Sequence, residues 1–178
     1  YFLRGTKVRK MDKSRRDTFR PVNDLPLAKV WPSGKIEVTN EHRKRSDKKV
    51  EADVKFEPKV AFLKTYPNSD PEIMEHMMSK GYKGFVLEGT GFGHVPTKAE
   101  KTWIPTIKKA SKDGIPVVIT SQALYGRVNT NVYDNLRTLF YEAKAISSED
   151  MTPETAYVKL AWVLGHTSDL NEVRKMML

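Results

Sequence analysis

Apolar and polar positions along this chain of 178 residues follow two successive patterns. In residues 1–56 the apolar runs are short, and Pro, Asp and Gly interrupt them before a helix could form. From residue 57 onwards, short apolar runs that are typical of buried strands alternate with segments whose apolar residues recur at helical spacing. The change of pattern predicts two regions, residues 1–56 and residues 57–178.

The first region is expected to be rich in β-structure. Pro32-Ser33-Gly34 lies between two short runs, Leu27–Val30 and Lys35–Thr39, which predicts two strands joined by a turn. Residues 40–53 are charged and contain few apolar side chains, so we expect them to form an exposed linker or flap.

The second region predicts an α/β fold. Strand-like runs and helical segments alternate with short loops between them, as in a Rossmann-like parallel sheet that carries helices on its faces. The expected strands are Val60–Thr65, Gly84–Leu87 and Pro116–Thr120, and the expected helices run from about Pro71 to Gly81, Trp103 to Lys112, Glu154 to Leu164 and Asn171 to Met177.

Local signals mark the starts of two of these helices and the faces that they bury. Ser69 or Asp70 can cap the first helix, and Thr152 can cap the helix that has Pro153 at its first position. Helical spacing predicts apolar faces made of Ile73, Met77 and Met78 in the first helix and of Val158, Leu160, Ala161 and Leu164 in the helix after Thr152.

The carboxyl ends of the strands form the edge of such a sheet at which ligands bind. The segments Glu88–His94 and Thr120–Gln122 both lie at this edge. Of the histidines, His94 alone is placed there, which makes it a candidate for contact with a substrate.

The glycine-rich run Gly89–Gly93 follows a strand, where a phosphate-binding loop would lie. His94 and Val95 stand where a dinucleotide motif has its third glycine and the start of a helix, and no Lys-Ser or Lys-Thr pair follows. We therefore expect a tight turn that brings the backbone close to a small ligand or to a neighbouring chain.

Composition excludes several classes of site. The chain has no cysteine, which excludes disulfides, cysteine-bound zinc and thiol catalysis and is typical of a cytoplasmic protein. The histidines at 42, 76, 94 and 166 lack the spacing of metal ligands, and no Gly-x-Ser-x-Gly motif accompanies Ser121. No apolar run approaches the ~18 residues of a membrane span. Because the first residues include neither an initiator Met nor a signal peptide, we expect the C-terminal part of a longer chain.

The net charge of +9 belongs to the first region. Residues 1–50 contain 15 Lys and Arg and 6 Asp and Glu, whereas residues 51–178 contain 16 of each class. Two interpretations remain open, a surface that contacts nucleic acid and an ordinary solvated surface.

Lys10 is the candidate for chemistry in this basic segment. In an extended strand Val8 and Lys10 lie on the same face, so Lys10 would be half-buried. A buried Lys is either paired or neutral, and both states suit a base or an electrostatic role. The alternative is a Lys whose aliphatic stem is covered while its amine stays in water.

Several strings of residues resemble the asparaginase/glutaminase family, and within it most closely the glutaminase subunits of archaeal glutamyl-tRNA(Gln) amidotransferases. They are Arg4–Met11, Ser14–Asp17, Phe19–Asp24, Tyr82–Phe85, Glu88–His94, Thr120–Gln122, Tyr125–Asn129, Glu149–Glu154 and Trp162–Thr167. Two stretches depart from the pattern. Residues 133–142 lack glycines that the family usually has, and residues 96–101 look like a small insertion.

The resemblance implies that residues 57–178 are the C-terminal α/β domain of an asparaginase-like fold and that residues 1–56 complete its N-terminal domain. It implies that Lys10 is a catalytic residue that works with two Thr and one Asp of the N-terminal domain. This chain alone would then lack the nucleophilic Thr. His94, Ser121 and Gln122 would lie at an edge that faces a substrate or a neighbouring subunit.

By the same resemblance, the complete subunit releases ammonia from glutamine and forms a homodimer within a heterotetramer. A kinase-like partner subunit, which uses ATP and Mg²⁺, binds tRNA and converts Glu-tRNA(Gln) to Gln-tRNA(Gln). No cofactor is expected in this chain. Two alternatives stay open, a free-standing L-asparaginase and a non-catalytic module that binds RNA through residues 4–20.

Overall fold

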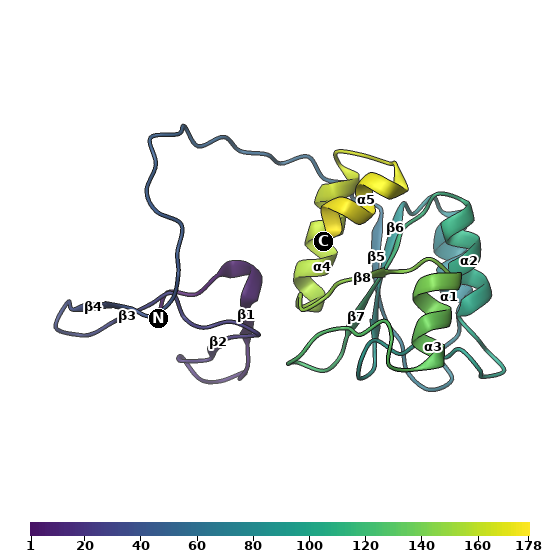
Figure 1. The fold of residues 1–178 in the computed structure, drawn as a ribbon, viewed down its shortest axis with the longest axis horizontal. Helices are drawn as coiled ribbons and strands as arrows, with labels where there is room; N and C mark the ends of the chain where they lie inside the picture. Colours follow the sequence, from purple (N-terminus) through teal and green to yellow (C-terminus); the bar gives the residue numbers. More distant parts are fainter. The chain divides into compact units, whose positions relative to one another are not determined.

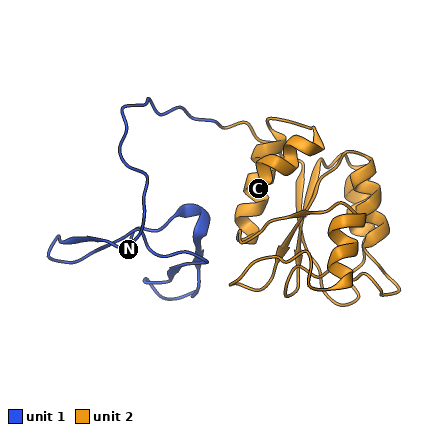
Figure 2. Ribbon diagram, in the orientation of Figure 1, with its two compact units in different colours: residues 1–53 blue, residues 54–178 orange.

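The computed structural model describes residues 1–178, which divide into two compact units, residues 1–53 and residues 54–178 (Figures 1 and 2). The division falls slightly before the position expected from the sequence, between residues 56 and 57. The backbone explains this difference, because Glu57 N donates to Ala161 O at 2.9 Å and a Cβ atom on Gly165 would overlap the carbonyl of Lys55. Residues 54–56 therefore pack with the second unit.

The second unit contains a four-stranded sheet in which every strand pair is parallel. Its strands lie in the order of the sequence, and they are β5 (Val60–Lys64), β6 (Gly84–Gly89), β7 (Val117–Ser121) and β8 (Ile146–Ser147). The expected α/β fold with a parallel sheet is confirmed. The two-residue strand β8 was not predicted from the sequence.

Helices cover both faces of this sheet (Figure 1). One face packs against α1 (Glu72–Ser79), α2 (Ile104–Lys112), α3 (Asp134–Arg137) and the π-helical turn η2 (Thr138–Glu142), and the other against α4 (Pro153–Leu164) and α5 (Leu170–Met177). Consecutive residues of a strand point to opposite faces, so Val86 packs towards α4 whereas Phe85 and Leu87 pack towards α1 and α2.

Two of the assignments to helix faces made from the sequence were wrong. Ile73 of α1 is 48% exposed, and the buried residue is Met74, which shares its face with Met77 and Met78. Val158 of α4 is 51% exposed, whereas Leu160 and its neighbours on that face are buried. In each helix the apolar residues at spacings of three and four set the buried face. Ile73, one position before Met74, and Val158, two positions before Leu160, lie outside it.

The predicted cap of α4 is present, whereas the cap position of α1 is Pro71 rather than Ser69 or Asp70. Thr152 Oγ1 accepts a hydrogen bond from Thr155 N at 3.3 Å, and Pro153 begins α4. Asp70 Oδ1 accepts from Glu72 N at 3.0 Å at the start of α1, and Gly81 follows this helix with a φ of +81°. Ser69 has a different role, since its hydroxyl accepts from the indole N–H of the buried Trp103 at 3.1 Å.

The first unit consists of two antiparallel hairpins and very little core. The elements are η1 (Gly5–Lys7), β1 (Val8–Lys10) paired with β2 (Phe19–Pro21), and β3 (Ala28–Val30) paired with β4 (Ile36–Val38). The expected turn lies between β3 and β4, where Gly34 has a φ of +83°. Val22 and Ala28 are the buried hydrophobic residues of this unit, and residues 41–53 are exposed and without regular structure.

The glycine-rich run after β6 is a tight turn, as expected. Thr90 N donates to His94 O at 2.9 Å, and His94 N donates to Thr90 O at 2.8 Å. Gly91 and Gly93 have φ values of +50° and +101°, a region that favours glycine. The turn also folds back on its own strand, so that a Cβ atom at Gly89 would lie 2.7 Å from His94 O.

Gly89→Ala should therefore destabilise the protein. The atoms that the new methyl group would meet are backbone atoms of Gly93 and His94, which cannot move aside as a flexible side chain would. We expect the free energy of unfolding, measured in urea, to fall by about 1–3 kcal/mol. Gly5→Ala is the matched control, because nothing lies within 4 Å of a Cβ atom there, and it should change this free energy by less than about 0.5 kcal/mol. Equal losses in both variants would contradict this account of the turn.

Candidate functional site

Lys10 is the last residue of β1 and lies opposite Phe19 in the register of the first hairpin. Val8, two residues earlier on the strand, is half-buried, but Lys10 itself is exposed. The expectation that Lys10 is half-buried is therefore wrong for the 178 residues described here. Its amine is open to whatever packs against this end of the hairpin.

The loop that follows Lys10 is closed by polar contacts. Beyond the ladder, Met11 N donates to Thr18 O at 2.9 Å, and Asp12 N donates to Thr18 Oγ1 at 2.6 Å. The carboxylate of Asp12 accepts from Ser14 N at 2.7 Å and from Arg15 N at 3.1 Å. The strand end beside Lys10 thus has a defined conformation although almost no apolar core supports it.

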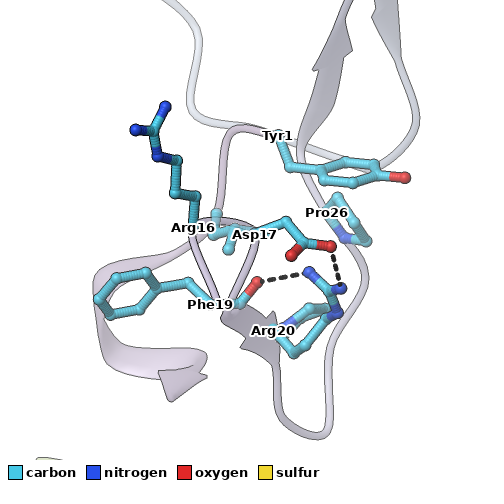
Figure 3. Close-up of a pocket in the computed structure, with 8 residues that line it drawn as sticks. Tyr1, Arg16, Asp17, Phe19, Arg20 and Pro26 are labelled. Carbon is cyan, nitrogen blue, oxygen red and sulfur yellow. Dashed lines mark hydrogen bonds and ion pairs between the residues drawn. The ribbon is translucent and has the colours of Figure 1, made fainter. Parts of the chain in front are cut away.

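Asp17 neutralises part of the positive charge of the loop. Arg15 holds its carboxylate with two hydrogen bonds, of 2.9 and 2.8 Å. Arg20 adds a third of 3.2 Å, which is drawn in Figure 3. These bonds, those from Arg15 first, lower the pKa of Asp17 to about 2. Arg4 is likewise paired with Asp24 at 2.8 Å. Three cations of residues 4–20, the segment considered for RNA binding, are therefore already paired with carboxylates of the chain.

A hollow of about 580 Å³ lies beside Asp17 (Figure 3). Arg16 points away from the Asp17–Arg20 pair in this view, and Lys10 is not part of the wall. The lining residues are Tyr1, Leu3, Arg16, Asp17, Phe19, Arg20, Pro21 and Pro26. The wall therefore contains both apolar and charged groups.

In the second unit, the parallel sheet brings the predicted edge segments together. Ser121 Oγ donates to Gly91 O and accepts from Ala123 N at 3.0 Å. Gln122 donates through its side-chain amide to Thr65 O at 2.6 Å and to Glu88 O at 3.0 Å. Both side chains thus bind backbone groups of neighbouring strand ends and fix the shape of the edge.

His94 lies differently from Ser121 and Gln122. It is half-buried, and its Nδ1 atom lies 3.2 Å from Thr90 O. It lines a small hollow of about 220 Å³ together with Thr65, Tyr66, Pro67, Thr90, Val95 and Pro96. His94 therefore borders an open space.

Sequence reasoning missed the aromatic neighbours of His94. The ring of Tyr133 lies 5.3 Å from that of His94 and 6.3 Å from that of Phe92, measured between centroids. Tyr133 reaches this place because Asn129 N donates to Phe92 O at 3.2 Å, which folds the loop before α3 back over the edge. No spacing in the sequence indicates this contact, since it depends on a tertiary fold of the loop.

Glu88, at the carboxyl end of β6, is the buried carboxylate of this edge. Its side chain is 7% exposed and lies 3.1 Å from Lys64 Nζ on the neighbouring strand. No group of three or more His, Cys, Asp or Glu side chains gathers in a way that could hold a metal ion. None of the helices has both the length and the apolar character needed to cross a membrane.

Comparison with known proteins places this geometry in context. Residues 59–177 match the glutaminase/asparaginase C-terminal domain family. The chain is 59% identical over 176 residues to the D subunit of the glutamyl-tRNA(Gln) amidotransferase of Thermococcus kodakarensis, and 49% identical to that of Methanobrevibacter smithii. These matches cover 98% and 99% of the chain but 39% and 40% of the relatives. The chain thus spans about two fifths of their length.

Solved structures show the same similarity. The thermostable L-asparaginase of Thermococcus kodakarensis superposes with a TM-score of 0.87 at 32% identity, and the match covers 98% of this chain and 52% of that enzyme. L-asparaginase I of Vibrio cholerae superposes with a TM-score of 0.83 at 25% identity over the same shares of the two chains. The expected resemblance to an asparaginase-like fold is confirmed.

The ion pair at Asp17 gives a prediction that a titration can test. The carboxyl should titrate near pH 2 in carbon-detected NMR spectra, and Arg15→Gln should raise its pKa towards the ordinary value of 3.8. Because the folded pKa is the lower one, the contribution of this pair to stability is present above pH 4 and is lost as the pH falls towards 2. Arg16→Gln should leave the titration unchanged. A midpoint near 4 in the unmodified protein would contradict the geometry described here.

Proposed function

Because this chain belongs to the glutaminase/asparaginase family, we propose that it is part of a glutaminase subunit that supplies ammonia for the conversion of Glu-tRNA(Gln) to Gln-tRNA(Gln). The observation that carries the proposal is the 59% identity to the D subunit of an archaeal amidotransferase across 98% of the chain. The basic hairpin and the sheet edge, the two places where chemistry was expected, both lie within the aligned part.

In the proposed reaction Lys10 assists a Thr hydroxyl that lies outside these 178 residues. The hydroxyl oxygen attacks the side-chain carbonyl carbon of glutamine, the C–N bond breaks, and ammonia leaves with the proton that the hydroxyl gives up. Water then hydrolyses the acyl ester and releases glutamate. Lys10, together with an Asp of the same outside domain, helps to remove the hydroxyl proton, and its exposure at a strand end leaves its amine accessible to that domain.

The surface of the first unit supports a partner domain. Two hydrophobic residues of this unit are buried, whereas large apolar side chains such as Phe2, Leu25 and Ile36 are 56%, 64% and 61% exposed. A unit of this size with so small a core is at best marginally stable alone. We propose that an N-terminal asparaginase domain, which carries the two Thr and the Asp, covers these side chains and completes the pocket around Lys10.

The complete subunit is proposed to act as a homodimer within a heterotetramer. A kinase-like partner subunit would bind tRNA and consume ATP with Mg²⁺, so that this chain needs no cofactor of its own. His94, Ser121 and Gln122 then belong to the edge that faces a substrate or a neighbouring subunit. Ser121 and Gln122 would shape this edge through backbone contacts, whereas His94 is placed to touch what lies against it.

One observation favours a second candidate, a free-standing L-asparaginase. The superposition on the Thermococcus L-asparaginase covers nearly the whole chain at a TM-score of 0.87. Such an enzyme would share the catalytic Lys and would need no tRNA-binding partner.

Lys10→Met in the complete subunit tests the catalytic assignment. Loss of the amine should lower the rate of ammonia release from glutamine by about 10²–10⁴-fold, because the hydroxyl then lacks its base. Lys13→Met is the control, since Lys13 is an exposed cation of the same loop and should retain normal activity. Circular dichroism and thermal unfolding should be unchanged in both variants. Near-normal ammonia release from Lys10→Met would refute the assignment.

Substrate preference separates the two candidate functions. Glutamine and asparagine hydrolysis would be measured for the complete subunit, with and without the kinase-like subunit and tRNA. An amidotransferase subunit should prefer glutamine and respond to its partner, whereas a free-standing asparaginase should prefer asparagine and be indifferent to the partner. The amidotransferase proposal would be overturned if the subunit hydrolysed asparagine but not glutamine, at a rate that did not change when the kinase-like subunit and tRNA were added.

A further inference from the structure

Thr18 is a buried polar residue in a unit that has hardly any core. It is 4% exposed, while its neighbours Asp17 and Phe19 are exposed. Its hydroxyl is bonded twice to the main chain of Asp12, since Asp12 N donates to Oγ1 at 2.6 Å and Oγ1 donates to Asp12 O at 2.5 Å. One side chain therefore satisfies both backbone groups of a residue two positions after Lys10.

This contact matters because the hairpin around Lys10 is short. The ladder of β1 and β2 has three residue pairs, and Lys10–Phe19 is the last of them. An isolated two-stranded ribbon is marginally stable in water, and its last pair separates most easily. The backbone bond from Met11 N to Thr18 O and the two bonds of the Thr18 hydroxyl extend the pairing beyond Lys10. They hold the backbone on the side where the ladder stops.

A lysine side chain is long and flexible, so the place that its amine can reach is set by the position of its Cα atom and the direction of its Cα–Cβ bond. A displacement of about 1 Å at a reacting group can cost on the order of 10²-fold in rate. The structure thus assigns to Thr18 the role of a positioning residue: its hydroxyl clamp on Asp12 fixes the strand end from which Lys10 presents its amine. This inference rests on the proposed function, in which Lys10 serves the hydrolysis of an amide.

Two features separate this role from ordinary structural support. The hydroxyl acts on the main chain next to Lys10 and on no apolar cluster, so its loss should loosen the loop and leave the second unit unaffected. The same unit also offers a comparison, because Thr39 Oγ1 donates to Pro26 O at 2.6 Å near the end of the other hairpin. Thr39 makes a hydroxyl-to-carbonyl bond of the same kind, far along the chain from Lys10.

The test compares Thr18→Val, Thr18→Ser and Thr39→Val in the complete subunit. Valine keeps the shape of Thr18 and removes the hydroxyl, whereas serine keeps the hydroxyl and removes the methyl group. We expect Thr18→Val to lower kcat for glutamine hydrolysis by about 10–100-fold with KM within about twofold, because the amine is misplaced while substrate binding is not. Thr18→Ser should restore kcat to within about threefold of the unmodified protein, and Thr39→Val should leave it unchanged.

Hydrogen exchange gives a second readout that does not depend on activity. The amide of Asp12 should exchange at least about tenfold faster in Thr18→Val than in Thr18→Ser, while amides of β6 stay protected in both. The inference is overturned if Thr18→Val keeps normal kcat, if Thr18→Ser loses as much activity as Thr18→Val, or if Thr39→Val loses as much as either. Should Thr18→Val fail to fold, Thr18→Ser decides: a loss of kcat in this variant while its Asp12 amide stays protected would overturn the inference.

The two proposals fail in distinguishable ways. If Lys10→Met remains active, the proposed function itself is wrong and the clamp has no catalytic consequence. If Lys10→Met is inactive while Thr18→Val is fully active, the function stands and the positioning role of Thr18 is refuted.

Discussion

The second unit depends on the burial of β6 on both of its faces. All six residues of this strand are buried, and its backbone is paired with β5 on one side and β7 on the other. The three strands run parallel; the helices that connect them, α1 and α2, cover one face of the sheet, and α4 and α5 cover the other. Parallel strands end at the same edge, so the glycine turn and the Ser121-Gln122 pair become neighbours through topology. The amide of Gln122 then fastens the ends of β5 and β6 through the carbonyls of Thr65 and Glu88.

The first unit is built on the opposite principle. Its conformation rests on hydrogen bonds and ion pairs between side chains and backbone at Asp12, Thr18 and Asp17, because Val22 and Ala28 make too small a core. Polar contacts of this kind define local shape well but contribute little stability when they are exposed to water. The first unit thus has a defined local conformation but little stability of its own, which suits a segment that packs against further apolar surface.

Most elements of the fold could be predicted from the sequence because their signals are local. Thr152-Pro153 marked the start of α4, and the apolar run at Val60 marked β5. The features that were missed depend on tertiary structure. Strand β8 is two residues long and is recognisable as a strand through its pairing with β7. Met74 is buried in place of Ile73 because the face that α1 turns to the core is the one that also holds Met77 and Met78.

The candidate site was predictable in the same uneven way. Its position at the strand ends follows from the alternation of strands and helices, so His94, Ser121 and Gln122 could be named in advance. The contacts of each side chain could not be predicted, because Ser121 and Gln122 donate hydrogen bonds to carbonyl oxygens that lie up to 57 residues away in the sequence. The environment of Lys10 is a different case, since the proposed chemistry assigns its partner groups, the two Thr and the Asp, to a domain outside these 178 residues.

The close approach at Gly165 has a consequence for how the molecule is made. The backbone of Lys55, just before β5, lies against this glycine at the end of α4, and Glu57 is bonded to Ala161 in the last turn of the same helix. During synthesis from the N-terminus, the start of the sheet therefore leaves the ribosome about 100 residues ahead of the surface on which it docks, a delay of several seconds at ordinary rates of translation. Over that interval the apolar face of the sheet that includes Val60 of β5 stays uncovered until α4 has been made.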